Sequence, residues 1–365
     1  MATGSMETAL MSDPTAKLPD DLLVEIISRV PYKSTRCCKC VSTRWRDLLA
    51  HPDHREKLPR STLAGFFYKI YDLKRRPPDS HGYLSVSGTG APGGIQYFGE
   101  LEDHCYWDSL SFLSEYESLQ ILDCCNGLLL CRARKSTDPE TLDDPKTLDY
   151  VVCNPATEKW VTVPATKWSW LVDSACLGFD PAVSAHFYVF ELVPDIAWVP
   201  SCAFLSRVLY LCPDNNSVAA VDVEGNCRII PIPTSHDAPD RPNVYASQGQ
   251  LYLTIQGASE LSIWVLEDSS SENCWTLKLN VSHLRLFGIE YSSSEQYYGV
   301  ISAHPEHDVI FIIKGFRLWY RPEKKLFSYD MDSGELCFIC DLPWNSTCPY
   351  LSYVPLFSES LADGH

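Results

Sequence analysis

The chain has 365 residues, of which 45% are hydrophobic and 21% charged, and its formal net charge at pH 7 is −17. This composition excludes a mainly disordered or collagen-like chain, and at about 150 residues per domain the length predicts two domains. The longest apolar runs, such as Val309–Ile313, are far shorter than the ~20 residues of a membrane-spanning helix. The first residues lack the basic and apolar segments of a secretory signal. We therefore expect a soluble protein of the cytoplasm, the nucleus or both.

The charge is unevenly distributed along the chain. Residues 18–60 carry nine Lys or Arg against six Asp or Glu, whereas residues 61–365 carry twenty against thirty-nine. An acidic body disfavours nucleic acid and anionic membranes as partners, because both are bound mainly through Lys and Arg. The contrast between a basic head and an acidic body predicts two modules with different partners.

The head has the pattern of short helices. Residues 1–16 are polar and predict a disordered tail. Leu18, Leu22, Ile26 and Val30 then recur every four residues, which predicts a helix with Asp20 as its N-cap and an end before Pro31. A second short helix is expected from Ser34 to Cys40. The spacing of Val41, Trp45, Leu48 and Leu49 predicts a third. Stripes this small cannot fully bury one another, so apolar surface should remain for a partner.

Residues 61–94 are transitional, with one strand expected at Ala64–Tyr71. From residue 95 to residue 357 the chain reads as short apolar or alternating runs separated by turn-forming pairs such as Asn-Gly and Ser-Gly. The runs predicted as strands are Leu119–Leu122, Leu128–Cys131, Tyr150–Cys153, Trp160–Val163, Phe187–Leu192, Val208–Cys212, Ser217–Val223, Leu251–Ile255, Ser262–Leu266, Trp275–Leu279, Tyr298–Ser302, Val309–Ile313, Leu326–Tyr329 and Leu336–Cys340.

A weak internal repeat indicates how these strands assemble. A strand, a polar turn and a second apolar or aromatic strand recur at 150–164, 218–233, 262–279 and 326–343. Recurring hairpins at this scale are typical of a β-propeller, in which small sheets surround an axis and ring closure removes long exposed edges. The fold class predicted is a small all-α head followed by a large all-β, propeller-like body, with a β-sandwich as the alternative. The expected organisation is a tail at 1–16, a helical domain at 17–60, a transition at 61–94, the β body at 95–357 and a tail at 358–365.

The sixteen cysteines are interpreted as reduced thiols, because most lie in apolar runs and no secretory signal precedes them. Two Cys-x-x-Cys pairs, Cys37/Cys40 and Cys337/Cys340, could bind zinc only if the head and the body brought them together. The His51/His54 and His304/His307 pairs lack the helical context of a two-histidine metal motif. We therefore predict no metal, no cofactor and no catalytic residue.

The head LPDDLLVEIISRVPYKSTRCCKCVSTRWRDLLAHP (18–52) resembles an F-box, through Leu18-Pro19, Val30-Pro31, Cys40-Val41 and Trp45. It departs from the family pattern at Thr35, where an apolar residue is usual. The resemblance continues through CCNGLLLCR (124–132), VVCNPATEKWVTVP (151–164), LGFDPA (177–182), FYVFEL (187–192), WVLED (264–268), SYDMDSG (328–334) and VPLFSESL (354–361). These segments are similar to grass-type plant F-box proteins, whose C-terminal part is an F-box-associated β-propeller-like domain.

This resemblance implies a non-catalytic subunit of a cullin-based, SCF-type ubiquitin ligase. The F-box would dock a Skp-type adaptor, and through it a cullin, while the β body would bind a substrate protein. Two alternatives stay open: an F-box interaction scaffold outside the ligase, and a propeller module that binds a sugar or small molecule. The residues implied to bind the adaptor are Leu18, Pro19, Leu22, Leu23, Ile26, Ile27, Val30, Pro31, Val41, Trp45, Leu48 and Leu49.

Overall fold

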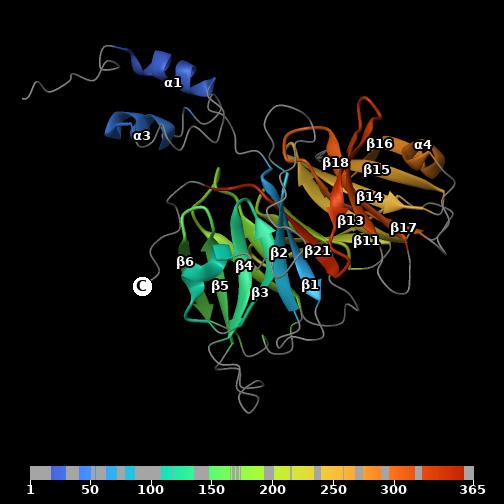
Figure 1. The fold of residues 1–365 in the computed structure, drawn as a ribbon, viewed down its shortest axis with the longest axis horizontal. Helices are drawn as coiled ribbons and strands as arrows, with labels where there is room; N and C mark the ends of the chain where they lie inside the picture. Colours follow the sequence, from blue (N-terminus) through green and yellow to red (C-terminus); the bar gives the residue numbers. More distant parts are fainter. Residues whose placement is uncertain are drawn as a thin grey trace, which may run out of the picture. The chain divides into compact units, whose positions relative to one another are not determined.

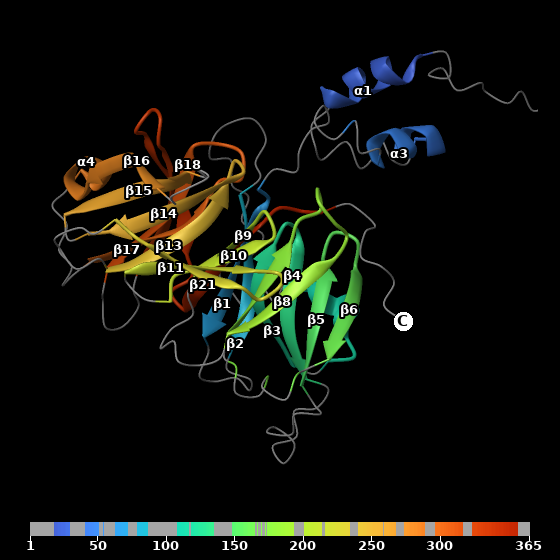
Figure 2. The same ribbon diagram turned by 180° about the vertical axis from the view of Figure 1, so that it is seen from behind.

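The structure is a computed structural model (Figures 1 and 2). It divides the chain into two compact units, residues 1–62 and 63–365. The residues described are 18–29, 41–50, 54, 63–71, 79–86, 108–116, 118–134, 148–164, 166, 169, 172, 174–192, 201–213, 216–233, 240–257, 259–267, 274–288, 296–316 and 323–356. Among these residues, no helix combines the length and the apolar character that a membrane crossing requires.

The helical unit contains α1 (Asp20–Ser28) and α3 (Thr43–Ala50). The expected N-cap, Asp20, is instead the first helical residue, because Pro19 occupies the cap position and its carbonyl accepts the first helical bond from Leu23. The negative charge of Asp20 in the first turn still interacts favourably with the helix dipole. At the start of α3 the Ser42 hydroxyl accepts a bond of 3.2 Å from the backbone N–H of Trp45, the usual geometry of a serine N-cap.

The described residues of the second unit form six antiparallel sheets, and apart from the β1–β21 pair the paired strands are adjacent in sequence. One sheet is β2 (Asp79–Ser85), β1 (Gly65–Tyr71) and β21 (Ser346–Tyr353); the next is β3 (Ser118–Cys125), β4 (Leu128–Arg134), β5 (Leu148–Asn154) and β6 (Lys159–Pro164). The third is β7 (Ser174–Phe179) with β8 (Phe187–Leu192), and the fourth is β9 (Cys202–Leu205), β10 (Val208–Leu211), β11 (Ser217–Asp222) and β12 (Cys227–Pro231). The last two are β13 (Asp240–Ser247), β14 (Gln250–Gln256), β15 (Glu260–Glu267) and β16 (Cys274–Ser282), and β17 (Gln296–Ala303), β18 (Val309–Phe316), β19 (Lys324–Asp330) and β20 (Leu336–Leu342). Two short helices accompany them, η2 (Asp108–Leu113) and α4 (His283–Phe287).

The sheets follow one another in a ring. The innermost strands β21, β3, β7, β9, β13 and β17 contact each other in this order, and β17 returns to β21. Ring closure joins the two ends of the unit, because β21 pairs with β1 (Figure 1). Five sheets of three or four strands are the blades, and the described two-stranded sheet β7–β8 lies in the ring between two of them. The propeller arrangement is therefore confirmed, and the β-sandwich alternative is not what the strand order shows.

The core of the β unit is divided among the interfaces between successive sheets. One apolar cluster lies at each of the six interfaces, so every sheet buries both of its faces. At the closing interface, for example, Phe66 of β1 packs edge-on against Phe311 of β18 with ring centroids 5.0 Å apart. Burial on both faces explains the near-continuous apolar runs of strands such as β4 and β18.

Every run predicted as a strand overlaps an observed strand, but β2, β7, β9, β13 and β21 were not predicted, and β12 was covered only by the hairpin repeat at 218–233. The missed strands carry weak signals, since β13 and β21 contain proline and β9 has four residues. Residues 61–94, expected to be transitional, contribute β1 and β2 to the sheet that contains β21.

The hairpins that leave the innermost strands β3, β9 and β13 share one turn geometry. Asn126-Gly127, Ser206-Arg207 and Gln248-Gly249 all have positive φ at both positions, as the twist of a two-residue hairpin requires. Gly127 also lies where a Cβ atom would approach the Leu356 Cβ to 2.5 Å. Only the first of these pairs is the Asn-Gly that a sequence pattern readily identifies.

Candidate functional site on the helical unit

Helix α1 presents two apolar stripes that meet different environments. Leu23 and Ile27 are fully buried, whereas Leu22 and Ile26 are 51% and 46% exposed. Each pair is four residues apart and so lies on one side of the helix. The two stripes are offset by one residue, about 100° around the helix axis. One stripe therefore forms the core of the unit, and the other remains open on its surface.

The buried stripe packs on α3. Val24 and Leu48 are buried beside Leu23, with Leu18 and Trp45 partly buried around them. Val24 was missed in the sequence analysis, although its spacing to Ile27 is the helical i, i+3 pattern. The sequence analysis followed the four-residue spacing of Leu18, Leu22, Ile26 and Val30 and did not include it.

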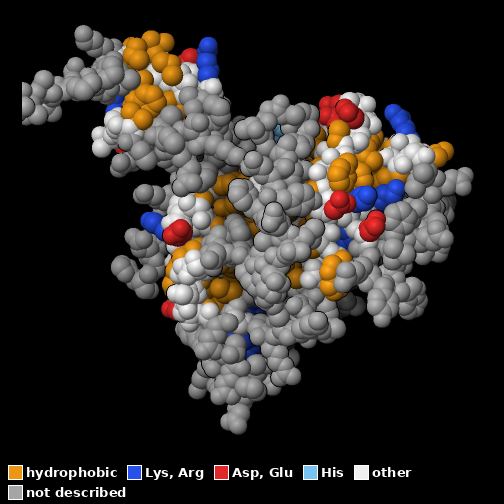
Figure 3. Space-filling model, viewed as in Figure 1, with side chains coloured by type: hydrophobic (Ala, Val, Ile, Leu, Met, Phe, Trp, Pro, Cys, Tyr) orange, Lys and Arg blue, Asp and Glu red, His pale blue; other side chains and the backbone are white. Residues whose placement is uncertain are grey.

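The open stripe belongs to a wider apolar surface. Val41, just before α3, is 57% exposed, and Pro19 is also exposed. In Figure 3 hydrophobic side chains gather on the visible surface of the helical unit. We call Pro19, Leu22, Ile26 and Val41 the open apolar residues.

Polar contacts hold α1 and α3 together. Arg44 of α3 donates to the Asp20 carboxylate, from Nε at 2.9 Å and from Nη2 at 2.6 Å, and to the Leu18 carbonyl at 2.5 Å. Because the Arg44 and Asp20 side chains are 34% and 58% exposed, solvent screens this pair and its contribution to stability is small. Arg44 therefore orients the two helices and is already engaged within the unit.

The structure divides the twelve residues predicted to bind an adaptor. Pro19, Leu22, Ile26 and Val41 are exposed, while Leu23, Ile27 and Leu48 lie in the core. Leu18 and Trp45 are partly buried against that core. Val30, Pro31 and the departure at Thr35 lie outside the described residues, as does the side chain of Leu49. That these residues contact an adaptor stays a prediction.

The structure describes some of the cysteine and histidine pairs that were considered for metal binding. Cys337 and Cys340 lie on β20, the first partly buried and the second buried, while Cys37 and Cys40 lie outside the described residues. The rings of His304 and His307, in the turn between β17 and β18, stack with centroids 4.6 Å apart.

His304 of this pair is held in its neutral form. Burial, assisted by the charge of His307, lowers the pKa of His304 to about 4. The Glu306 backbone N–H donates to His304 Nδ1 at 3.1 Å, which requires an unprotonated nitrogen there. His304 is thus held neutral, as a part of the turn.

Comparison with known proteins supports the F-box resemblance of the N-terminal residues. Residues 16–57 match the F-box domain family. The chain is 25% identical over 218 residues to a putative F-box protein of Arabidopsis thaliana, which covers 58% of this chain and 50% of that protein. A putative F-box/kelch-repeat protein of the same plant is 28% identical over 171 residues, 45% of this chain and 36% of that protein. A third Arabidopsis F-box protein is 25% identical over 324 residues, 72% of this chain and 70% of its own length.

Solved structures are similar only at a distance. A functionally unknown protein from Desulfotomaculum acetoxidans has 9% identity and a TM-score of 0.34, over 75% of this chain and 82% of that one. Virginiamycin B lyase from Staphylococcus aureus has 14% identity and a TM-score of 0.30, over 61% and 68%. These scores are too low to transfer fold or chemistry. The match of residues 16–57 and the three relatives show that the chain carries an N-terminal F-box domain and is similar to F-box proteins of Arabidopsis thaliana.

Proposed function

We propose that this chain is the substrate-recognition subunit of a cullin-based, SCF-type ubiquitin ligase, and that it performs no covalent chemistry itself. Its F-box docks a Skp-type adaptor, and its β unit, a plant F-box-associated propeller, holds a substrate protein. The observation that carries the proposal is the exposed stripe of Leu22 and Ile26 within the residues that match the F-box domain.

The open apolar residues have the properties of a docking face. A helix that exposes Leu and Ile four residues apart fits a helix-in-groove or helix-on-helix contact with an apolar partner surface. Burying such side chains is worth about 1.5–3 kcal/mol each. The buried residues Leu23, Val24, Ile27 and Leu48 act indirectly, because they hold α1 and α3 in the arrangement that presents this face.

The β unit completes the function by proximity. A substrate held on it would be kept near the conjugating enzyme carried elsewhere in the ligase, which raises its effective concentration at the reacting groups. The relatives support this role in part, since one is named an F-box/kelch-repeat protein. We also propose a cytoplasmic or nuclear location, where thiols such as those of the buried Cys131 and Cys153 stay reduced.

Co-purification of the full chain with a plant Skp-type adaptor tests the docking step. In one variant, Leu22→Asp and Ile26→Asp together place two charges on the exposed stripe. Burying unpaired charges in an interface is strongly unfavourable, so this variant should lose the adaptor. Both positions are solvent-exposed in the free chain, so the variant should fold.

Val183→Asp provides the matched control, because Val183 is 58% exposed in the turn between β7 and β8. It should bind the adaptor as the wild type does. Circular dichroism of all three proteins checks that they are folded. A folded wild-type chain that fails to bind, or a double variant that binds equally well, contradicts the docking proposal.

A further inference from the structure

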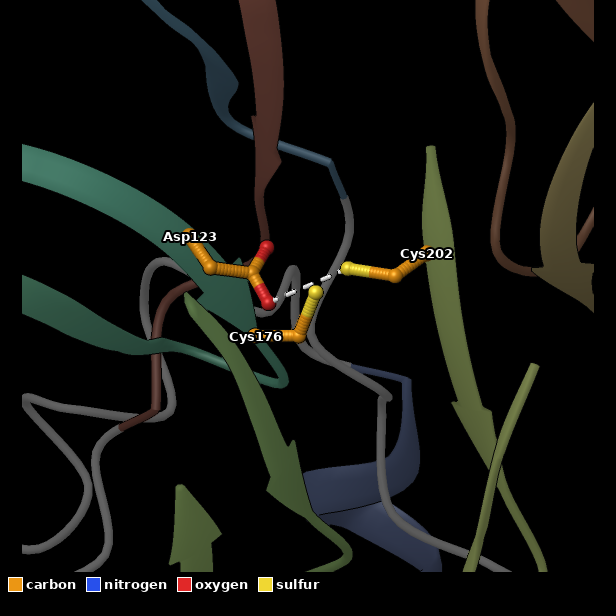
Figure 4. A group of neighbouring side chains, drawn as sticks. All are labelled: Asp123, Cys176 and Cys202. Carbon is orange, nitrogen blue, oxygen red and sulfur yellow. Dashed lines mark hydrogen bonds between the residues drawn. The ribbon is translucent and has the colours of Figure 1, made fainter. Parts of the chain in front are cut away.

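Three metal-ligating side chains converge where the innermost strands of three successive sheets meet. Asp123 lies on β3, Cys176 on β7 and Cys202 on β9. Figure 4 shows the carboxylate and both sulfur atoms pointing toward one another from three strands. The three strands belong to three different sheets, so the cluster exists only in the closed ring.

The group is compact and largely withdrawn from solvent. One ligand atom from each residue lies within 4.8 Å of the other two, and the Asp123 Oδ2 to Cys202 Sγ distance is 3.5 Å. Asp123 is 8% exposed and Cys176 2%, while Cys202 is partly buried. Among the described residues this is the one group of three or more His, Cys, Asp or Glu with such close ligand atoms.

The Asp123 carboxylate is fixed in place by the backbone. Its Oδ1 accepts the N–H of Cys124 at 2.8 Å, and its Oδ2 accepts the N–H of Leu177 at 2.7 Å. A β-bulge between Ile121 and Asp123 interrupts the register of β3 with β4, and bulges commonly re-aim a side chain near functional sites. None of the bonded partners of Asp123 among the described residues carries a positive charge.

Other junctions between innermost strands are joined differently. Ser201 accepts the N–H of Val244 at 2.9 Å, and the Tyr245 hydroxyl donates to the Val300 carbonyl at 2.6 Å. A neutral hydroxyl therefore suffices to link neighbouring strands. The β3–β7–β9 junction instead uses a buried acid and two thiols, a more costly set to bury unless a cation compensates it.

We propose that Asp123, Cys176 and Cys202 bind one zinc ion that joins β3, β7 and β9. Zinc bonds of about 2.0–2.2 Å to oxygen and 2.3 Å to sulfur place those two atoms about 3.5 Å apart in a tetrahedron, which is the spacing of Asp123 and Cys202. Thiolates select zinc over magnesium or calcium, and the carboxylate disfavours the softer Cu(I).

Binding replaces the two thiol protons, which leave to solvent, and involves no oxidation. The two cysteines and Asp123 supply three ligands, and the fourth position is left for water or another ligand. The site is independent of adaptor docking, because all three residues belong to the β unit.

Metal binding to the reduced, full-length chain tests the proposal. The wild type should retain one equivalent of Zn²⁺ after dialysis, by elemental analysis. Co²⁺ in place of Zn²⁺ should give thiolate-to-cobalt absorption and tetrahedral visible bands. Cys176→Ala, Cys202→Ala and Asp123→Asn should each lose retained Zn²⁺, and the two cysteine variants should also lose most of the thiolate absorption.

Cys131→Ala is the matched control, because Cys131 is equally buried, on β4, and lies outside the cluster. It should bind Zn²⁺ and Co²⁺ as the wild type does. The wild-type spectrum decides the question even where a variant fails to fold. A folded, reduced wild type that shows neither retained Zn²⁺ nor cobalt–thiolate absorption overturns the site, as does equal loss of metal in Cys131→Ala.

A disulfide is the competing use of the two cysteines. Peptide mapping of the chain purified without reductant would reveal a Cys176–Cys202 bond. If that bond forms and the reduced protein does not bind Zn²⁺ or Co²⁺, the pair is a redox pair and the zinc site is wrong.

Discussion

On α1 of the helical unit, Leu22 and Ile26 remain about half exposed beside the buried Leu23 and Ile27. In the β unit, by contrast, each sheet is covered on both faces by its neighbours in the ring, and Phe66 and Ile312 are fully buried. Both units are built from apolar stripes of the expected period. They differ in what buries the apolar side chains. In the ring, each sheet is buried by the neighbouring sheets, whereas on α1 one apolar stripe is not buried by any of the described residues.

This difference separates stability from binding in the two units. An apolar side chain buried between two sheets of the ring contributes to the stability of the β unit. On α1, adjacent residues are expected to have different roles: Leu23 stabilises the fold of the helical unit, and Leu22 contacts the adaptor. Three substitution experiments test this comparison.

Removal of Phe66 should give the largest effect. Phe66→Ala leaves a cavity against Phe311 at the interface that closes the ring, and such truncations cost about 3–5 kcal/mol. Urea unfolding of the full chain, followed by tryptophan fluorescence, measures this loss. Phe338→Ala, at a position 51% exposed, should cost less than about 1 kcal/mol. Equal losses at the two positions would contradict a core divided among the sheet interfaces.

A neighbouring pair on α1 should separate folding from docking. Ile27→Ala removes a fully buried side chain and should destabilise the helical unit by about 2–4 kcal/mol. Leu22→Ala should change its stability by no more than about 0.5 kcal/mol, because the side chain is exposed. Hydrogen exchange of the α1 amides reports the stability of this unit within the full chain. Faster exchange in the Leu22 variant than in the Ile27 variant would reverse our assignment of the two stripes.

The pH dependence of His304 should be the smallest effect. Its pKa is about 4 in the folded protein and near 6.5 when unfolded, so the unfolded chain binds the extra proton between these values. The stability that His304 contributes is complete above pH 6.5 and is lost as pH falls toward 4.

His304→Asn keeps an acceptor for the Glu306 N–H and removes the titration. The two pKa values correspond to about 3 kcal/mol between pH 7 and pH 4, and solvent screening of the partly buried ring reduces this. The variant should therefore lose about 1–2 kcal/mol less stability than the wild type over that range. Thermal melts of both proteins across that range measure the difference. Parallel curves would show that His304 titrates normally in the folded chain.

The weak hairpin repeat predicted a propeller, and hydrophobic spacing predicted α1, α3 and most of the short strands. The helices and strands are local features, since a stripe of period 3.6 or 2 is written into a few consecutive residues. The pattern could not separate Leu22 from Leu23, because adjacent apolar residues both fit a broad helical stripe. Only packing against α3 buried one and left the other exposed.

The Asp123 cluster lay beyond the reach of sequence patterns for the same reason. Cys176 and Cys202 sit on β7 and β9, two short strands that were not predicted, and the three residues are separated by 53 and 26 positions in the chain. The sequence by itself determined the elements, the F-box resemblance and the two-module organisation. The tertiary structure alone decided which stripe of α1 stays open and which side chains meet at the ring, because both depend on contacts between segments that no local pattern connects.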